Sequence, residues 1–336
     1  MRRALGYLGA CALAVACGSN DGDAPGPGAS SVAPDGPDPG GSSSGFQGGP
    51  PDASPDGGGG FVLPANLVKT ERGGYALGAP LTGDGVPTPN APQAGGAGGG
   101  GSCSLLVGVV RDFKGLKDPG GHPDFESFLG DGITANLVER ALGVDRKPVY
   151  ASRCEASLVG GAAGCPVGPI TSSKPLFDQW YRYAAGVNQP YVVYLQFEPN
   201  AGVYTFESNF YFPLDGAGWN DHGMGQDGKA HNFAFTTEVH TAFRYNGGES
   251  FVFTGDDDVW VFMNGKLAVD LGGLHQPLNG TIVLDQMADA LGLVKGQTYP
   301  FELFQAERHT SGSRFRVDTN LTFTNCGTIP PDAPPR

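Results

Sequence analysis

The sequence is poor in charged residues, and the charges that it has are mostly acidic. Charged residues make up 16% of the 336 positions, and 34 Asp and Glu against 21 Lys and Arg give a formal net charge of −13. Binding to nucleic acid requires clustered lysine and arginine, so this composition argues against a nucleic-acid partner. The chain also lacks the His-Glu-x-x-His zinc motif, the EF-hand calcium loop and the glycine-rich phosphate loop.

Long hydrophobic runs are also absent, and the run near the start is too short to span a membrane as a helix. Arg2 and Arg3 precede an apolar run that ends at Ala16, which is the pattern of a secretory signal. The residues before Cys17 (LAVA) resemble a bacterial lipobox, in which the cysteine carries the lipid and becomes the mature N-terminus. We therefore predict a lipoprotein-type signal over residues 1–17, lipidated at Cys17, with cleavage without lipid as the alternative.

Residues 18–102 contain few aromatic residues and are dominated by Gly, Pro, Ser, Asp and Ala. Such a segment buries too little apolar surface to offset the entropy of ordering the chain. We expect a disordered tether, on the order of 50 Å from end to end, that holds a folded domain away from a membrane or surface layer. Its only apolar patches, residues 61–68 and 75–77, could dock on that domain. A second disordered tail is expected over residues 328–336.

The six cysteines divide by position, with two in the leader and four in the expected domain. Four cysteines allow three pairings, and an exported protein favours disulfides over free thiols. We favour a Cys154–Cys165 bridge within a glycine-rich loop, and a Cys103–Cys326 bridge that would join the first strand of the domain to the last. Free buried thiols are the alternative.

Residues 103–327 are predicted to form one all-β domain. Between residues 232 and 245, Phe, Val and Tyr side chains alternate with polar ones, as in a strand with one buried face. Many short strands separated by glycine-rich turns are typical of a β-sandwich or barrel. Further strands are expected at 104–113, 191–197, 203–212 and 315–323, and short helices near 132–142 and 177–183.

The stretch 255–275, with the sequence GDDDVWVFMNGKLAVDLGGLH, contains the strongest local signal. Its Asn-Gly pair predicts a hairpin, because a type I′ turn needs positive φ at both central residues. Three aspartates then lie at one end of the hairpin, beside a glycine pair and His275. The expected strand pairs are Met263 with Lys266, Phe262 with Leu267, Trp260 with Val269, and Asp258 with Leu271.

The aspartates at positions 256 to 258 are candidate cation ligands. Neighbouring side chains on a strand point to opposite faces, so two adjacent aspartates do not normally share one ion. A cis peptide would bring both carboxylates together, and a bound cation could offset its cost of about 3–4 kcal/mol. Carboxylate oxygens favour Ca²⁺ over thiophilic metals. A solvated acidic turn, or carboxylates that accept hydrogen bonds from loop amides, is the alternative.

The stretch 253–275 also resembles the signature of the fibro-slime domain family. This family is related to the protective-antigen-type β-barrel domain of bacterial toxins, glycosidases and yeast adhesins. The resemblance spans about residues 103–326. Supporting stretches occur in the expected order at 122–126 (HPDFE), 212–215 (FPLD), 231–240 (HNFAFTTEVH) and 306–313 (AERHTSGS).

The resemblance implies a fold and a ligand. In the sugar-binding relatives, an Asp-Asp pair joined by a cis peptide holds Ca²⁺, and the Ca²⁺ holds sugar hydroxyl groups. Aligning the Asn-Gly turn with the turn of the family places this pair on Asp256 and Asp257. This sequence departs from the pattern at Asp258, where many relatives have glycine, so the local backbone is expected to differ.

Other acidic and histidine residues invite an acid–base interpretation. Glu238 and His240 share a strand face, and Glu307 precedes Arg308 and His309, so either set could act in proton transfer. We favour buried ion pairs instead, for example between Arg308 and either Glu307 or Glu238.

Taken together, these features predict an exported protein of the cell envelope or surface that is anchored to the membrane by its N-terminal lipid and is not an enzyme. Its β-domain is expected to bind extracellular carbohydrate or a matrix polymer, with Ca²⁺ as the cofactor. One alternative is a structural matrix protein that self-associates or binds a protein partner. Another is a polysaccharide-acting enzyme, which needs two carboxylates across a cleft.

Overall fold

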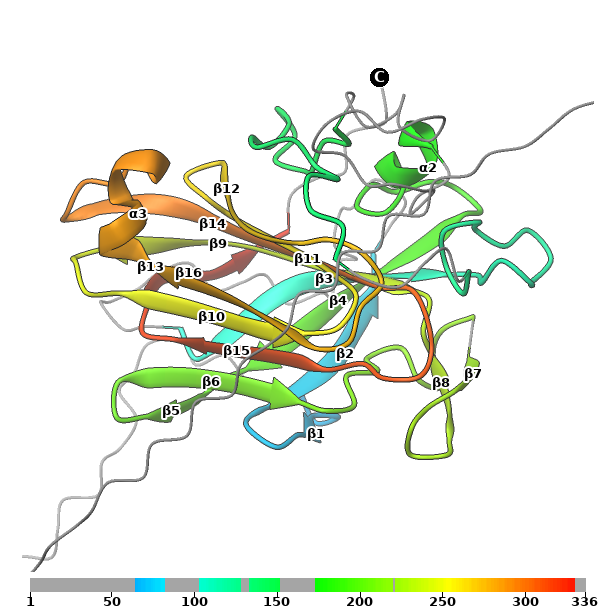
Figure 1. Cartoon of the computed structure of the whole chain (residues 1–336). Helices are drawn as coiled ribbons and strands as arrows, with labels where there is room; N and C mark the ends of the chain where they lie inside the picture. Colours follow the sequence, from blue (N-terminus) through cyan, green and yellow to red (C-terminus); the bar gives the residue numbers. More distant parts are fainter. Residues whose placement is uncertain (1–63, 82–102, 128–132, 152–172, 220, 330–336) are drawn as a thin grey trace, which may run out of the picture. The chain divides into compact units, whose positions relative to one another are not determined.

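Two antiparallel β-sheets packed face to face form the framework of the computed structural model (Figure 1). The predicted all-β sandwich with a few short helices is confirmed. The structure describes residues 64–81, 103–127, 133–151, 173–219 and 221–329, all within one compact unit, Asp56–Arg336. The predicted leader with Cys17 and the predicted Cys154–Cys165 bridge lie outside the described residues.

The larger sheet has nine strands, in the order β1-β2-β4-β3-β9-β14-β11-β12, with β16 paired to β9 beside this path. Strands distant in the sequence are therefore neighbours in space, which is typical of a sandwich. The bounds are β1 (Val68–Lys69), β2 (Gly74–Pro80), β3 (Leu105–Phe113), β4 (Asn188–Gln196), β9 (Phe235–Tyr245), β11 (Asp258–Met263), β12 (Lys266–Leu271), β14 (Gln297–Glu307) and β16 (Thr322–Thr328).

The smaller sheet has five strands, in the order β13-β10-β15-β6-β5, and a separate hairpin pairs β7 with β8. The described residues also contain two short helices, α2 (Lys174–Asp178) and α3 (Leu284–Leu291). Neither helix is long and apolar enough to cross a membrane. The bounds are β5 (Glu198–Asn200), β6 (Val203–Ser208), β7 (Asp221–Met224), β8 (Ala230–Asn232), β10 (Ser250–Gly255), β13 (Leu278–Val283) and β15 (Phe315–Thr319).

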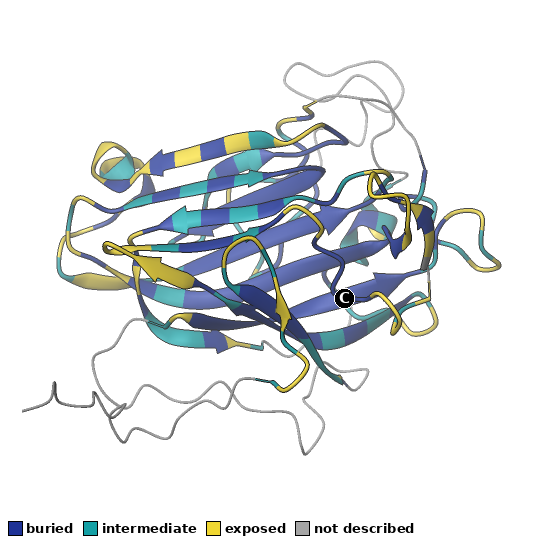
Figure 2. Cartoon of the chain, turned by 90° about the horizontal axis from the view of Figure 1, so that it is seen from below, coloured by how far each residue is buried: buried dark blue, intermediate teal, exposed yellow. Residues whose placement is uncertain are grey.

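The main core lies between the two sheets and contains alternate residues of their strands. In β9, Phe235, Val239 and Phe243 point into this core, as the alternation predicted. The opposite face of β9 is not exposed to solvent, because its polar residues from Thr236 to His240 are buried as well. Figure 2 shows long dark blue stretches along many strands, while yellow lies in loops and on edge strands such as β13.

A second apolar cluster covers the outer face of the larger sheet. Trp260 of β11 packs there against Phe177 and Trp180 of the segment between β3 and β4. Phe304 of β14 packs against Tyr181. The Thr236 hydroxyl donates a hydrogen bond of 2.7 Å to the Trp180 carbonyl. The described parts of residues 114–187 therefore act as a cover over this face, which explains why β9 is buried on both sides.

The cover is mostly irregular, in contrast to the helix predicted near residues 132–142. Asn136 has φ of 68°, which is in the left-handed region and interrupts a right-handed helix. Val138 instead forms an isolated β-bridge with Tyr150. The other predicted helix is present as α2, a few residues earlier than expected.

An internal stretch of the predicted tether, residues 64–81, belongs to the folded domain. Residues 64–81 contain β1 and β2, and β2 pairs with β4 from Gly74 to Pro80. Tyr75 and Ala76 are buried, so the apolar patch at 75–77 supplies enough buried surface to order this stretch. A disordered tether over all of residues 18–102 is therefore wrong for residues 64–81.

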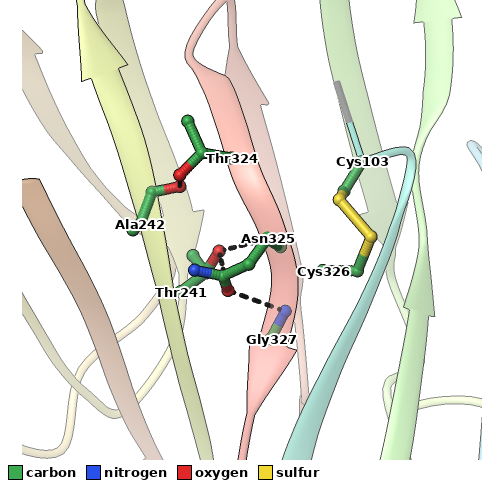
Figure 3. The surroundings of a disulfide bond; sticks show 7 residues. All are labelled: Cys103, Thr241, Ala242, Thr324, Asn325, Cys326 and Gly327. Carbon is green, nitrogen blue, oxygen red and sulfur yellow. Dashed lines mark hydrogen bonds between the residues drawn. A yellow bond between two sulfur atoms is a disulfide. The ribbon is translucent and has the colours of Figure 1, made fainter. Parts of the chain in front are cut away.

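A disulfide joins Cys103, just before β3, to Cys326 in β16 (Figure 3). The two Cα atoms are 5.2 Å apart, and the bond closes a loop across 223 positions of the sequence. This is the pairing that the sequence analysis favoured. Next to it, the Thr241 hydroxyl of β9 donates a hydrogen bond of 2.6 Å to the Asn325 carbonyl, which holds β16 against the central strand.

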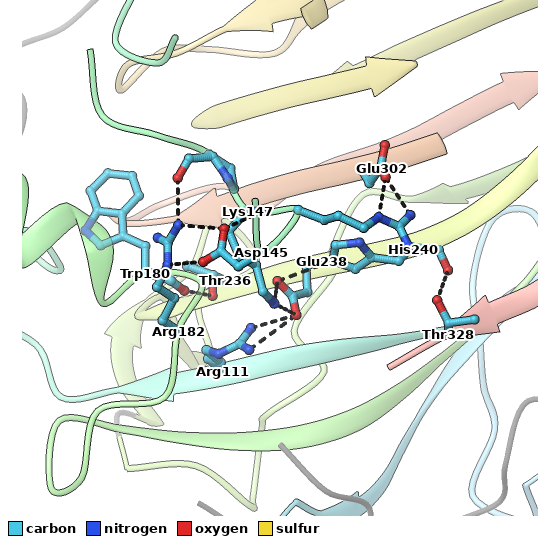
Figure 4. A network of polar contacts seen from close by, with 12 residues as sticks. Arg111, Asp145, Lys147, Trp180, Arg182, Thr236, Glu238, His240, Glu302 and Thr328 are labelled. Atoms are coloured by element: carbon cyan, nitrogen blue, oxygen red, sulfur yellow. Dashed lines mark hydrogen bonds and ion pairs between the residues drawn. The ribbon is translucent and has the colours of Figure 1, made fainter. Parts of the chain in front are cut away.

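Buried ion pairs fasten the cover to the larger sheet (Figure 4). Glu238 of β9 accepts hydrogen bonds of 2.5 and 2.7 Å from Lys147 Nζ and lies 3.2 Å from the Arg111 guanidinium. Burial alone would raise the pKa of Glu238, but the charges of Arg111 and Lys147 hold it well below its usual range. Beside this cluster, Arg146 Nε donates a hydrogen bond of 2.9 Å to Glu302 of β14.

His240 lies beside this cluster, with Nε2 3.8 Å from Glu238 Oε2. Burial lowers the pKa of His240 to about 4, although the Glu238 carboxylate opposes the shift, so the ring is neutral at pH 7. Both side chains are almost fully buried, which favours a structural role for Glu238 and His240 over proton transfer to an external substrate. Glu238 is a buried ion-pair residue, but its partners are Arg111 and Lys147 and not the predicted Arg308.

Replacing both Cys103 and Cys326 by serine is expected to lower the free energy of unfolding by about 2–5 kcal/mol, because the unfolded chain then loses a long-range crosslink. Urea unfolding at pH 7, followed by tryptophan fluorescence, measures this loss. Val144→Ser, at a fully exposed position, is the control and should unfold like the wild type. A double variant with the midpoint of the wild type would contradict a stabilising crosslink.

Acidification is expected to destabilise the wild type more than the His240→Gln variant. Histidine in the unfolded chain titrates near pH 6.5, whereas His240 in the folded protein titrates at about 4. The proton therefore binds the unfolded state first, and stability is lost as the pH falls from about 6.5 to about 4, by up to about 3 kcal/mol.

Urea unfolding at several pH values between 7 and 4 tests this loss. His222→Gln is the control, because the side chain of His222 is 59% exposed. The same pH dependence in the wild type and in His240→Gln would contradict the prediction.

Candidate functional site

The hairpin between β11 and β12 forms where the sequence predicts it. Asn264 and Gly265 have φ of 53° and 69°, as a type I′ turn requires. The two pairs nearest the turn, Met263 with Lys266 and Phe262 with Leu267, are confirmed. A β-bulge between Val261 and Phe262 then shifts the register by one residue, so the two remaining predicted pairs are wrong. The observed pairs are Val261 with Val269, Trp260 with Asp270, and Val259 with Leu271.

The aspartates lie where the chain passes from one sheet to the other. Asp256 and Asp257 connect β10 of the smaller sheet to β11 of the larger one, and residues 308–314 connect β14 back to β15. β10 pairs with β15 and β11 pairs with β14, so the two connections run side by side. We call them the aspartate crossover (256–257) and the return crossover (308–314).

Main-chain amides of the return crossover hold both carboxylates of the aspartate crossover. Asp256 Oδ1 accepts a hydrogen bond from the Arg314 N–H at 2.5 Å. Asp257 Oδ2 accepts hydrogen bonds from the N–H groups of Arg308 and His309, at 2.8 and 3.1 Å. These bonds fix the orientation of both carboxylates.

The backbone that positions these carboxylates differs from the one suggested by the resemblance. The peptide bond between Asp256 and Asp257 is trans, and the cis peptide bond found among the described residues joins Thr310 to Ser311 in the return crossover. Asp257 instead adopts a left-handed conformation with φ of 55°. This conformation departs from the extended strand, in which neighbouring side chains would point to opposite faces.

Both carboxylates line one pocket of about 100 Å³. Its other walls come from the return crossover, from the residues after β12 and from the turn of the β7–β8 hairpin. The Gln226 N–H of that turn donates a hydrogen bond of 2.9 Å to the Ser311 carbonyl, which ties the hairpin to the site. The remaining lining residues are Gln226, Leu274, His275, Gln276, His309, Thr310, Ser311 and Gly312.

The buried corner of the sandwich formed by Asp256, Asp257 and Glu307 is unfavourable for negative charge, because it is shielded from water. Burial raises the pKa of Asp256 to about 6 and that of Asp257 to about 7, and for Asp257 the neighbouring Asp258 and Asp256 add to the effect. The pKa of Glu307 at the end of β14 is raised well above its usual value by burial and by Asp257 and Asp256. The Glu307 carboxyl group interacts with the side chains of Ser313 and Asp257. Three carboxyl groups thus share a desolvated corner.

Asp258 differs from its two neighbours because it is neutralised. Its Oδ2 accepts a hydrogen bond of 2.6 Å from Arg308 Nε, and its Oδ1 accepts one of 2.6 Å from the Gly273 N–H. Both side chains of the ion pair are fully buried. A buried ion pair of Arg308 was predicted, but its partner is Asp258 and not Glu307 or Glu238.

The calcium prediction is not tested by this arrangement. Among the described residues, no group of three or more His, Cys, Asp or Glu side chains is arranged as a metal site. Ca²⁺ at Asp256 and Asp257 therefore stays a prediction.

The sequence analysis identified one side of the site and missed the other. It placed Asp256, Asp257 and His275 together, and all three line the pocket. It gave no binding role to the return crossover. The signal that could have identified the return crossover is the stretch 306–313, which belongs to the resemblance. A prediction that β14 pairs with β11 would have placed this stretch opposite the aspartates.

In a comparison with known families, the model of the PA14 domain matches part of this chain. The family model matches residues 185–335, a range that contains both crossovers and the pocket. This agrees with the protective-antigen-type resemblance of the sequence.

Curated relatives come from Dictyostelium discoideum. Protein psiR is 37% identical over 216 residues, a match that covers 61% of this chain and 20% of psiR. Protein psiC is 35% identical over 215 residues, covering 62% of this chain and 40% of psiC. The chain therefore spans less than half of the length of these relatives.

Among solved structures, the chain is similar to the PA14 domain of the antifreeze protein MpAFP, with a TM-score of 0.25 and 8% identity, over 70% of this chain and 98% of that one. It is also similar to a PA14 sugar-binding domain from an RTX adhesin, with a TM-score of 0.21 and 10% identity, over 40% of this chain and 81% of that one. Neither likeness is close enough to transfer a binding property to this chain.

Replacing Gly312 by alanine is expected to destabilise the site. A Cβ atom at this position would lie 2.8 Å from Asp256 Oδ2 and 3.2 Å from Gln226 Nε2, and the carboxylate is already held by the Arg314 N–H. Overpacking of this kind costs about 1–3 kcal/mol. Urea unfolding in the presence of EDTA measures the loss. Ser311→Ala, in the same crossover, is the matched control, and an equal effect of the two substitutions would contradict the steric argument.

Proposed function

We propose that this protein is exported and surface-anchored, and that its β-domain binds carbohydrate through a Ca²⁺ ion held by Asp256 and Asp257. One observation carries this proposal. Two adjacent carboxylates lie at a sheet-to-sheet crossover, each is fixed by main-chain amides, and both line the same pocket. Such preorganised hard oxygen ligands suit Ca²⁺.

The charge of the corner supports a cation. Arg308 already pairs with Asp258, while burial raises the pKa values of Asp256, Asp257 and Glu307. A divalent cation would supply the positive charge that these desolvated carboxyl groups lack. We assign the carboxylates of Asp256 and Asp257 as its ligands, because both line the pocket and are oriented by main-chain hydrogen bonds.

The pocket also offers groups for the sugar itself. When bound, Ca²⁺ would supply a charge to which sugar hydroxyl oxygens can bind. The amide groups of Gln226 and Gln276 line the same pocket and can donate and accept hydrogen bonds at the remaining hydroxyls. His275 borders this pocket, and its position is fixed because its ring nitrogens contact the Leu271 and Gln276 carbonyls at 3.1 and 3.0 Å.

The PA14 domain supports a binding role over catalysis. We place the chain more narrowly in the fibro-slime branch of protective-antigen-type domains, on the residues 253–275 and the supporting stretches described above. Export and a lipid anchor at Cys17 follow from the leader pattern in the sequence. The partner is then an extracellular carbohydrate or matrix polymer.

Calcium is expected to raise the thermal midpoint of the wild type and to leave that of Asp257→Asn unchanged. At a hundredfold excess over the dissociation constant, the stabilisation is about 2.7 kcal/mol, or about 5–10 °C. In EDTA the variant should be at least as stable as the wild type, because it removes a buried charge. Differential scanning calorimetry measures both effects, with Asp289→Asn, an exposed aspartate of α3, as the control.

A glycan array probed with the full chain, in Ca²⁺ and in EDTA, tests the sugar. We expect signals that require Ca²⁺ and that are lost in Asp257→Asn but kept in Asp289→Asn. Calcium binding without any glycan signal would favour the structural matrix protein. No calcium-linked shift in the wild type would overturn the cation site.

A further inference from the structure

A second and larger cavity, of about 640 Å³, opens beside the β7–β8 hairpin. We call it the hairpin groove. Its walls come from the β1–β2 hairpin, from the residues after β6 and from the end of the β7–β8 hairpin. It shares no lining residue with the aspartate pocket, although Gln226 of the β7–β8 hairpin lines that pocket and Asp227 lines the groove.

Hydrogen bonds hold two walls of the hairpin groove in place. The Glu71 carboxylate accepts bonds of 3.0 Å from both the main-chain N–H and the side-chain amide of Asn209. Next to this contact, the main chains of Arg72 and Glu207 exchange hydrogen bonds of 3.2 and 3.0 Å. The groove is therefore largely preformed, which lowers the entropic cost of binding a ligand.

The floor of the groove is a histidine held between two carboxylates. His231 stacks on Phe212 with ring centroids 3.9 Å apart and an angle of 8° between the rings. Its Nδ1 lies 2.5 Å from Asp215 Oδ2, and its Nε2 lies 3.0 Å from Asp227 Oδ1. The pKa of Asp227 is lowered by the Lys229 N–H and by His231, so its carboxylate is a charged acceptor at neutral pH.

Two of the exposed residues that line the groove are apolar, among exposed charged ones. The side chains of Phe210 and Val68 line it and are 43% and 48% exposed, whereas most of the aromatic residues nearby are buried. A flat apolar ring beside fixed acceptor oxygens matches the two kinds of surface on a sugar ring, its C–H face and its hydroxyl edge. The volume is also within the range of about 300–1,000 Å³ that is usual for small-molecule sites.

We infer that the hairpin groove is a second carbohydrate site that binds a short segment of a neutral polysaccharide without a cation. One sugar ring stacks on Phe210, and its hydroxyl groups donate hydrogen bonds to the Asp215 and Asp227 carboxylates. Three carboxylates and two lysines line the groove, so anionic polymers are disfavoured. The inference shares its ligand class with the proposed function but depends on different residues.

Titration of the full chain in EDTA with three tetrasaccharides tests this site: β-1,4-linked glucose, β-1,4-linked N-acetylglucosamine and α-1,4-linked glucose. We expect at least one to bind, and Phe210→Ala to weaken that binding about fivefold to tenfold through loss of ring contacts. Phe210→Tyr should retain it. Val294→Ala, at another exposed apolar residue, should bind like the wild type. Isothermal titration calorimetry gives the affinities.

The outcomes separate this site from the aspartate pocket. Binding that occurs only in Ca²⁺ would overturn the hairpin groove and leave the proposed function intact. Binding in EDTA that Phe210→Ala and Val294→Ala affect equally would also overturn it, and so would the absence of binding by all three tetrasaccharides in EDTA. Thermal unfolding shows whether Phe210→Ala is folded. If it is not, the affinity of Phe210→Tyr is the measurement that tests the site, and it should equal that of the wild type.

Discussion

The buried ion pair between Asp258 and Arg308 is the interaction on which the rest of the site depends. Asp258 begins β11 and Arg308 follows β14, so their contact fixes the two crossovers beside each other. The same guanidinium lies over the Trp180 ring at 4.6 Å and donates a hydrogen bond to the Asp124 carbonyl, so it also binds the cover to the sheet. Because a buried charge without its partner costs about 3–5 kcal/mol, these three parts are held in one arrangement.

This pairing also explains why three consecutive aspartates have different properties. Asp258 takes the available guanidinium and a main-chain N–H, and is thereby committed to structure. Asp256 and Asp257 receive main-chain hydrogen bonds, which orient their carboxylates but provide no full positive charge. Their raised pKa values are the electrostatic result of this division. Identical residues at adjacent positions thus acquire separate roles from their partners and burial.

Features that depend on residues close together in the sequence could be predicted, whereas features that depend on contacts between distant residues could not. Local signals were sufficient for the Asn264-Gly265 turn, for the core face of β9 and for grouping Asp256 with Asp257. The register beyond the bulge at Val261 could not be read from the sequence, because a bulge depends on how the strand packs against β14. The cover over the larger sheet could not be predicted for a similar reason, because its polar contacts join residues far apart in the chain. The return crossover became part of the site only through the pairing of β14 with β11.

The Cys103–Cys326 bond has a consequence for a protein exposed to proteases. It makes residues 103–326 a covalent ring that includes every residue of both crossovers. A single cut anywhere inside that ring opens it without releasing a fragment, so the two cut ends stay attached to one molecule and can remain packed in the sandwich. The β1–β2 hairpin lies outside the ring and forms one wall of the hairpin groove. A cut between β2 and Cys103 would thus leave that wall attached only by noncovalent contacts, while the aspartate pocket would stay within the covalent ring.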